Sequence, residues 1–358
     1  MTSLTQLLKH SVVSKKPISE SVYTSLLDEQ EKLFLPIQNM AKKAQYLHFK
    51  NQVYIRGLIE ISNYCNNDCD YCGIRCSNKA VQRFRLSDED ILTCCKKGYA
   101  LGFKTFVLQG GEDLLFDVDR VSKLIRQIKK EFSDCALTLS LGEKPAEVYA
   151  EWKKEGADRY LLRHESANSN HYAFLHQSPV DQKRGRTAIY RQNCLYTLKK
   201  LGYQTGAGFM VGTPLQTNQH VVEDLLFLQD LQPEMIGIGP YIPHPETPLG
   251  KISPIPTPTQ RFHKTLYLLS LLRNIHPRAL LPSTTALATL IPGGREKGIL
   301  HGANVVMPNL SPEKTSNKYE IYKNKLNTGS ESANGLATLS KALESIGYEI
   351  NKGIGNYV

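Results

Sequence analysis

Short apolar runs alternate with longer amphipathic stretches along most of the chain from about residue 55. A strand, a crossover helix and a further strand form the unit that builds a parallel sheet. Repeated around a ring, such units give a TIM-type (β/α)8 barrel, and this α/β fold is the one that we predict. The amphipathic, helix-like stretches include Asp88–Leu101, Asp119–Phe132, Pro145–Gly156 and His220–Leu231. The strand-like runs are Leu58–Ile61, Thr105–Gln109, Ala136–Leu141, Tyr160–Arg163, Gly206–Val211, Met235–Gly239, Leu280–Thr284 and Asn304–Met307.

We expect the barrel to span residues 55–311, with additional structure on both sides. Residues 1–54 predict an N-terminal helical extension outside the barrel. Residues 312–358 predict a C-terminal segment packed on the barrel, with a helix over Asn334–Ile346. The proline-rich segment Pro240–Pro258 predicts an extended loop, because proline cannot continue a helix. This loop follows the sixth strand, so it should lie at the carboxyl end of the barrel, where barrel enzymes place their active sites.

The composition is that of a globular chain with ample apolar material for a core, 41% hydrophobic and 22% charged over 358 residues. No apolar run is long enough to cross a membrane and no secretory signal is visible, so we expect a cytoplasmic protein without a membrane partner. Residues 1–19 contain lysine, serine and threonine but no acid, a pattern that an organellar import signal shares; a helix with a polar face is the favoured reading. The net charge of +10 is spread along the chain, so no nucleic-acid partner is expected.

The cysteines are concentrated in one short segment. Of the 8 cysteines none lies beyond Cys194, and Cys65, Cys69 and Cys72 form a C-x3-C-x2-C pattern directly after the first strand. One dense cluster in a long chain indicates a metal site rather than a disulfide framework. Three thiolates can hold a 4Fe–4S cluster and leave one iron open. The alternative is a zinc site, or a closed cluster that uses Cys76 as fourth ligand; we expect Cys76 to be a bystander.

Three further polar segments follow predicted strands. Gln109-Gly110-Gly111-Glu112 follows the second strand, where glycines let the backbone approach a bound amine. Arg163-His164-Glu165 ends the fourth strand, where the carboxylate can accept hydrogen bonds from a ligand or simply pair with Arg163. Arg191, on the next helix, can grip a carboxylate through two N–H groups or can be an ordinary surface arginine.

The cysteine pattern, the aromatic Tyr71 before its last cysteine and the Gly-Gly-Glu segment resemble the radical S-adenosylmethionine (SAM) superfamily. Longer stretches resemble one family within it, the FeFe-hydrogenase maturase HydE family. These stretches are RGLIEISNYCNNDCDYCGIR, LQGGED, LTLSLGE, DRYLLRHESAN, LGYQTGAGFMVGTP, GIGPYIPHPETPL, PSTTALATLIPGGRE and GANVVMPNLSP.

The resemblance implies a barrel with a 4Fe–4S cluster and SAM at its carboxyl end and a substrate cavity below. The cluster would be held by Cys65, Cys69 and Cys72. SAM would be surrounded by Tyr71, Gln109, Gly110, Gly111, Glu112, Ser140, Glu165, Arg191, Met210 and Met235. The cavity would be lined by Thr138, Arg163, Thr284, Thr285, Met307, Tyr319 and Tyr322. The implied substrate is a cysteine-bound iron complex carrying CO and cyanide, and the implied partners are the maturases HydG and HydF and an electron donor.

Two features depart from the family pattern. Some members carry cysteines near the C-terminus for a second cluster, and this chain has none there, so a single cluster is predicted. Many members have Tyr-Arg shortly after the MPN motif, where this chain has Thr315-Ser316, which puts the cavity contacts near residue 315 in doubt.

Three other readings remain open from the sequence. A lysine mutase similar to methylornithine synthase would share the barrel and could use Thr284 and Thr285 to bind an amino acid. An enzyme similar to biotin synthase would need cysteines for a second cluster on barrel strands, and only Cys135 lies near such a strand. A noncatalytic carrier of an iron–sulfur cluster would not need the SAM segments.

The cysteine pattern predicts the metal content of the protein. After anaerobic reconstitution we expect about four irons per chain, because three thiolates hold one 4Fe–4S cluster. Cys65→Ala, Cys69→Ala and Cys72→Ala should each abolish binding, whereas Cys76→Ala should retain it. About eight irons would contradict the single cluster, and loss of iron in Cys76→Ala would favour the four-cysteine site.

Overall fold

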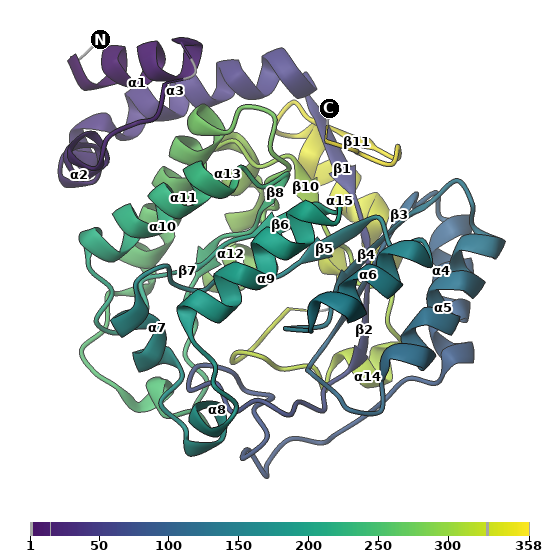
Figure 1. The fold of residues 1–358 in the computed structure, drawn as a ribbon. Helices are drawn as coiled ribbons and strands as arrows, with labels where there is room; N and C mark the ends of the chain where they lie inside the picture. Colours follow the sequence, from purple (N-terminus) through teal and green to yellow (C-terminus); the bar gives the residue numbers. More distant parts are fainter. Residues whose placement is uncertain (1–2, 15, 327–328, 358) are drawn as a thin grey trace.

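The computed structural model describes residues 3–14, 16–326 and 329–357. Its centre is a six-stranded parallel sheet whose strands neighbour one another in chain order (Figure 1). Apolar side chains are buried on both faces of these strands, as expected for a sheet covered by helices. The strands are β2 (Gly57–Ser62), β3 (Thr105–Gly110), β4 (Ala136–Ser140), β5 (Arg159–Leu161), β6 (Gln204–Ala207) and β8 (Met235–Ile236).

Isolated parallel bridges continue the sheet beyond β8 and return it to β2. They join Met235 to Leu280, Pro282 to Val305, and Asn309 to Leu58. The pairings therefore close a ring, in agreement with the predicted barrel. The predicted strand Leu280–Thr284 forms bridges but no continuous strand, because Pro282 has no N–H for the ladder. The last predicted strand is shorter than expected, with β10 at Val305–Val306.

The predicted strand Gly206–Val211 is interrupted in the middle. It forms β6 and a separate β7 (Met210–Val211), which pairs with β9 (Gly239–Pro240). Gly208 lies at the break with a φ of +150°, and a Cβ there would come within 2.0 Å of the Gly237 carbonyl oxygen. The backbones on either side approach too closely for a side chain, so glycine is required at this position.

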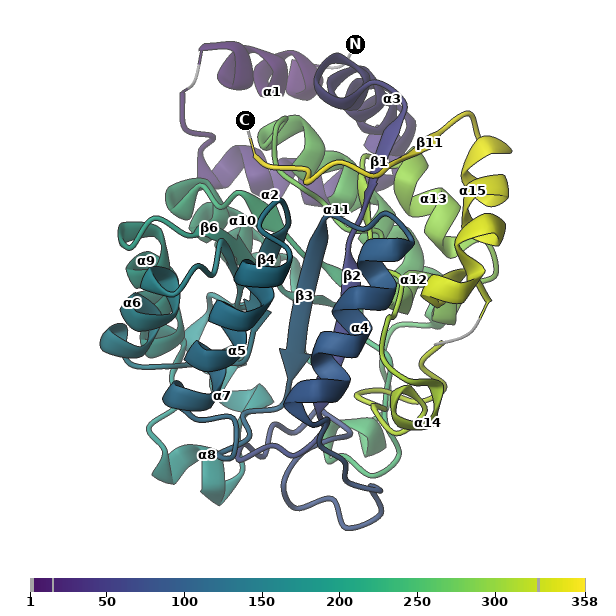
Figure 2. The same ribbon diagram turned by 90° about the vertical axis from the view of Figure 1, so that its right-hand side faces the viewer.

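Helices cover the outside of the ring, and their sequences fix where they begin. Ser87 and Asp90 form a capping box at α4 (Asp88–Ala100), and Asp117 caps α5 (Val118–Glu131) with its side chain. The carboxyl ends of the strands point toward α7 (Ser169–Leu175), α8 (Pro179–Lys183) and α14 (Glu313–Ser316), at the lower end of Figure 2. The outer helices are α4 (Asp88–Ala100), α5 (Val118–Glu131), α6 (Ala146–Lys154), α9 (Ala188–Lys200), α10 (Asn218–Leu231), α11 (Pro258–Ile275), α12 (Thr285–Leu290) and α13 (Gly294–Leu300).

The two ends of the chain pack at the opposite, amino end of the barrel (Figures 1 and 2). Helices α1 (Ser3–Ser14), α2 (Glu20–Asp28) and α3 (Gln30–Phe49) come first, and α3 packs along α11. The strand β1 (Gln52–Ile55) pairs with both β10 and β11 (Glu349–Asn351). The predicted C-terminal helix is present as α15 (Leu336–Glu344). Within the described ranges no helix combines the length and the apolar character needed to cross a bilayer.

A buried histidine joins the N-terminal helices to the barrel. The Gln38 side-chain amide on α3 lies 3.0 Å from His301 Nε2, and Ser270 Oγ lies 2.9 Å from His301 Nδ1. The Ser270 hydroxyl also reaches the His301 carbonyl, so Nδ1 carries the proton and Nε2 accepts from Gln38. Burial, helped by the charge of Lys42, lowers the pKa of His301 to about 4.

This histidine predicts a loss of stability in acid. The folded pKa lies below the value of about 6.5 in the unfolded chain, so the unfolded state takes up a proton first as the pH falls. The contribution is complete above pH 6.5 and is lost toward pH 4, by at most about 3 kcal/mol. Chemical denaturation of His301→Gln should show a shallower decline between these pH values than the unsubstituted chain. His10→Gln, at an exposed position, is the control, and an unchanged decline in His301→Gln would contradict the assignment.

Candidate active site

A cavity of about 340 Å³ lies at the carboxyl end of the barrel strands. The loops after β2, β3, β4 and β5 and the segment 319–325 all contribute to its wall. It brings together nearly all the residues that the sequence singled out. Those on its wall are Cys65, Cys69, Tyr71, Cys72, Gln109, Gly110, Gly111, Glu112, Ser140, Arg163, Glu165, Arg191, Met210, Thr284, Thr285, Met307, Tyr319 and Tyr322.

Two predicted residues lie deeper in the barrel. Thr138 and Met235 line a smaller cavity of about 20 Å³, which shares Met307 with the larger one. Arg56 donates from Nη1 to the Met235 sulfur at 3.0 Å. The two cavities adjoin, since Leu161, Gly237 and Pro282 also line both, and Met235 lies on the smaller one.

The cysteine loop after β2 is held by ion pairs within itself and by a hydrogen bond to α8. Arg75 donates to both oxygens of Asp68 at 2.7 Å and pairs with Asp70 at 2.9 Å. The Asp68 amide in turn donates to Asp181 Oδ1 at 3.0 Å. Burial alone would raise the pKa of Asp68, but hydrogen bonds from Arg75 and Ser77 lower it well below its usual value. The loop is thus fixed by charge-assisted hydrogen bonds, with little regular structure of its own.

The cysteine thiols reach the cavity from this loop. Burial and the neighbouring Cys69 raise the pKa of Cys65 to about 12, and burial also raises the pKa of Cys69 and Cys72. A metal centre must therefore displace protons when it binds these sulfurs. Cys76 is not on the cavity wall, and its amide donates to Asn67 O at 2.9 Å. Three converging thiols with the fourth turned elsewhere fit a cluster with one open iron.

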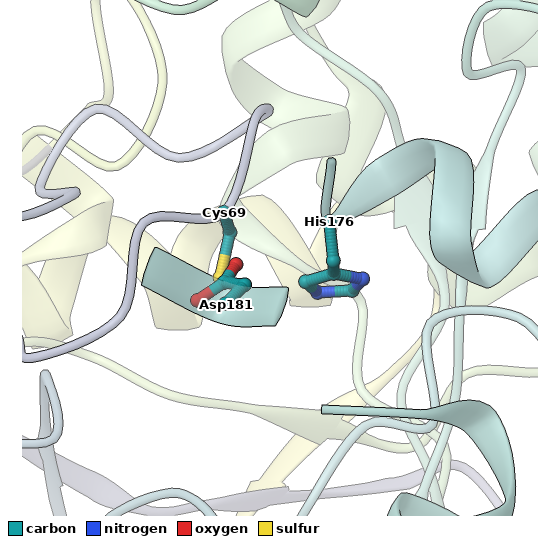
Figure 3. Close-up of side chains that lie close together, drawn as sticks. All are labelled: Cys69, His176 and Asp181. Carbon is teal, nitrogen blue, oxygen red and sulfur yellow. The ribbon is translucent and has the colours of Figure 1, made fainter. Parts of the chain in front are cut away.

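Cys69 also lies beside a histidine and an aspartate (Figure 3). One ligand atom each from Cys69, His176 and Asp181 lie within 4.8 Å of one another. Asp181 is already bound by the Asp68 amide and by Arg186, and His176 Nδ1 lies 2.8 Å from Tyr172 O. Because this group shares Cys69 with the thiol triad, it belongs to the same site and is no separate metal centre.

The Gly-Gly-Glu segment packs directly against the first cysteine. A Cβ on Gly111 would come within 2.2 Å of Tyr64 O and 2.7 Å of Cys65 Cβ. Glu112 turns its carboxylate toward the loop after β4, where the Glu143 amide donates to it at 2.9 Å. Its own carbonyl accepts from the Asn66 amide at 2.9 Å. This segment joins the cysteine loop to the wall of the barrel.

Glu165 is held in an uncommon backbone conformation with its carboxylate on the cavity wall. Its φ is +63°, which costs a non-glycine residue about 1–3 kcal/mol. The amide of Glu165 donates to Gly208 O at 3.1 Å, and His164 beside it is buried against Asp224 at 3.2 Å. Arg163 Nη2 lies 3.4 Å from Glu165 Oε2, yet neither atom has a hydrogen-bond partner. The strained backbone therefore presents groups that a bound ligand could satisfy.

Two buried arginines share one carboxylate that the sequence did not single out. Arg191 is only 6% exposed, which excludes a surface arginine. Its Nε donates to Glu143 Oε1 and its Nη1 to Arg163 O at 2.9 Å. Arg186 Nε donates to the other oxygen, Glu143 Oε2, at 3.2 Å, and Arg186 Nη1 donates to Cys69 Sγ at 3.0 Å. Ion pairs between loops this far apart in the chain leave no local sequence pattern.

The segment after α14 covers the cavity. Tyr319 Oη accepts from Gln109 Nε2 at 3.4 Å, and Lys325 pairs with Glu60 at 2.6 Å. Thr315 and Ser316, whose effect on the cavity the sequence left in doubt, form the end of α14 just before this segment. Both hydroxyls donate to backbone carbonyls of their own helix, and neither residue is on the cavity wall.

The sequence matches the family model of the radical SAM superfamily over residues 59–228. It is 42% identical to the [FeFe] hydrogenase maturase subunit HydE of Thermotoga maritima over 309 residues, 86% of this chain and 84% of that protein. It is 25% identical to 3-methylornithine synthase of Methanosarcina acetivorans over 90% of this chain and 86% of that protein.

The fold is similar to two solved structures. Methylornithine synthase (PylB) superposes with a TM-score of 0.79 at 23% identity, covering 96% of this chain and 97% of that one. The [FeFe]-hydrogenase maturase HydG superposes with a TM-score of 0.79 at 20% identity, covering 98% of this chain and 77% of that one. At these identities the likeness concerns the fold alone.

The packing at the glycine pair predicts how its two positions differ. Gly111→Ala should displace Cys65 and reduce iron loading several-fold, because its Cβ would overlap Tyr64 O and Cys65 Cβ. Gly110→Ala is the matched control, since its Cβ would meet Ile61 and Ser62 only at 3.3 Å and should leave the iron content unchanged. Iron is measured per folded chain after anaerobic reconstitution. Full loading of Gly111→Ala would contradict the predicted packing.

Proposed function

Because the chain belongs to the HydE family of radical SAM enzymes, we propose that it matures the active-site cluster of FeFe-hydrogenase by acting on a cysteine-bound iron complex that carries CO and cyanide. The observation that carries this proposal is one cavity, which gathers three thiols, a glycine pair and an arginine with unused hydrogen-bond donors. The identity of 42% to a HydE supports the same assignment.

Cys65, Cys69 and Cys72 would hold the 4Fe–4S cluster that the family requires. When bound, such a cluster would supply the electron for reductive cleavage of a C–S bond of SAM. The chain contributes the three thiolates and the rigid loop that holds them at one end of the cavity. The tight packing of Gly111 against Cys65 leaves the backbone of the glycine pair beside this site.

The residues that would orient SAM provide different kinds of contact: a hydrogen-bond acceptor, a cation and accessible backbone. Glu165 has an unpaired buried oxygen, Oε2, which suits a hydroxyl donor such as those of ribose. Arg191 is a buried cation fixed by Glu143, which suits a carboxylate. Gly110 and Gly111 allow the backbone of the β3 loop to approach the amino group. The other residues that we assign to this site are Tyr71, Gln109, Glu112, Ser140 and Met210.

The substrate end of the cavity suits an anion with several hydrogen-bond acceptors. Arg163 leaves Nε and Nη2 unpaired, and Thr284 leaves its hydroxyl unpaired. Thr285 differs, because its hydroxyl donates to Glu331 Oε2 at 2.8 Å. We therefore assign the direct contacts to Arg163 and Thr284, and a supporting role to Thr285. Met307, Tyr319 and Tyr322 complete the wall, and Thr138 lies below them.

The covering segment would exclude water. Lys325 and Tyr319 hold this segment against the cavity wall through contacts to Glu60 and Gln109. A closed site prevents solvent from consuming a reactive intermediate. The partners that we propose are HydG as the source of the iron complex, HydF as a fellow maturase and a one-electron donor protein.

Methylornithine synthase is the second candidate, since the two proteins share the barrel and 25% identity over most of their length. Arg163 and Thr284 could also bind an amino acid. An activity like that of biotin synthase is less compatible with the structure. Cys135 is 3% exposed, with its sulfur against Phe103 O at 3.8 Å, and it is not on the wall of either cavity.

Complementation tests the proposal most directly. Expression of this chain in a hydrogenase-producing strain that lacks HydE should restore hydrogen evolution. Cys72→Ala should not restore it, because one cluster ligand is lost. Thr284→Val, which removes the unpaired hydroxyl at nearly constant volume, should lower the restored activity by about tenfold, the effect of one lost hydrogen bond of roughly 1.4 kcal/mol.

Purified protein separates the two candidates. Reconstituted with iron and sulfide, and given dithionite and SAM, it should release 5′-deoxyadenosine under either assignment. Formation of 3-methylornithine from lysine without complementation would establish the second candidate in place of the first. Absence of 5′-deoxyadenosine from a fully loaded protein would overturn both.

A further inference from the structure

Arg186 makes a side-chain contact to the thiol triad that the established chemistry leaves unused. Its Nη1 donates to Cys69 Sγ at 3.0 Å. The other two thiols take hydrogen bonds from backbone amides, Cys65 from Asn67 and Glu112, and Cys72 from Ile74. Cys69 therefore receives a charged donor where its neighbours receive neutral ones.

The guanidinium is fixed on two further sides. Asp181 Oδ1 lies 3.4 Å from Nη1, and Glu143 Oε2 accepts from Nε at 3.2 Å. The side chains of all three are nearly inaccessible, with exposures of 3% for Arg186, 0% for Asp181 and 7% for Glu143. The carboxylates of Asp181 and Glu143 fix the plane of the Arg186 guanidinium. Its contact to the Cys69 sulfur therefore does not depend on a mobile side chain.

Burial makes this contact electrostatically strong. In a site of low effective dielectric, a cation against a sulfur interacts far more strongly than it would in water. Hydrogen bonds to cluster sulfurs and the local charge are among the main determinants of the reduction potential of an iron–sulfur centre. One-electron reduction makes the cluster and its thiolates more negative, so a positively charged donor favours the reduced form.

We infer that Arg186, held by Asp181 and Glu143, is a positioning residue that raises the reduction potential of the cluster bound by Cys69 and thereby makes it reducible by a physiological one-electron donor. The inference rests on the proposed ligation by Cys65, Cys69 and Cys72. Because Glu143 also holds Arg191, the proposed SAM contact, one carboxylate connects the sulfur contact to the SAM end of the site.

The test is a redox titration of the reconstituted protein in the absence of SAM, with dithionite as reductant and EPR of the reduced cluster as readout. Arg186→Met removes the donor and the charge at similar volume. Its equilibrium constant for reduction should fall at least tenfold, which lowers the midpoint potential by about 59 mV or more for one electron. Arg186→Gln, which keeps a polar side chain but loses the charge, should shift in the same direction.

Lys183→Met is the matched control. It removes one positive charge from the same segment at an exposed position and should leave the potential unchanged. Iron content and thermal unfolding are measured on every variant. An unchanged potential in a loaded Arg186 variant would overturn the inference. Failure of both Arg186→Met and Arg186→Gln to hold iron would replace the tuning role with a purely structural one.

The two proposals fail in different ways. If the unsubstituted chain holds fewer than about four irons, the ligation is wrong and the proposed function fails with it. If it holds a full cluster and releases 5′-deoxyadenosine, but the potential does not respond to Arg186, only the present inference fails.

Discussion

The closed ring of parallel pairings is the constraint on which the whole site depends. Because every strand runs in the same direction, the loops after β2, β3, β4 and β5 all emerge at one end, although their cavity residues extend along the chain from Cys65 to Arg186. The bridge between Leu58 and Asn309 completes the ring and brings the covering segment over the same end. Without this closure the thiols, the glycine pair and Arg163 would not face one cavity.

At the carboxyl end of the barrel, buried hydrogen bonds and ion pairs determine how the loops of the site are positioned. Asp181, on α8, accepts a hydrogen bond from the Asp68 amide and forms an ion pair with Arg186. It thereby joins the cysteine loop to α8. Glu143 forms ion pairs with Arg186 and Arg191, and these contacts join the loop after β4 to α9. Each pair costs desolvation energy, and removing one partner would leave an uncompensated buried charge. These contacts therefore fix the geometry of the loops more than they add to stability.

Much of the site could be predicted from sequence because its residues follow strands at short, recognisable spacings. Cys65, Cys69, Cys72, Gly111 and Glu165 all reach the predicted cavity. Met235 lines the smaller cavity beside it, and the sequence alone does not reveal how deep along a strand a side chain lies. Three residues were missed for a different reason. The contacts of Glu143, Asp181 and Arg186 cross between loops, so only the folded chain reveals them.

The cationic side chains on the cavity wall differ in whether other protein groups already pair with them. Its cations are Arg163, Arg186, Arg191 and Lys325. The last three donate to carboxylates or sulfur, as in the pairs with Glu143 and Glu60. Arg163 alone on this wall retains buried N–H groups without hydrogen-bond partners, since its ion pair with Glu165 lacks hydrogen-bond geometry. Buried donors are seldom left unpaired, so this arginine is the group that an anionic ligand would complete.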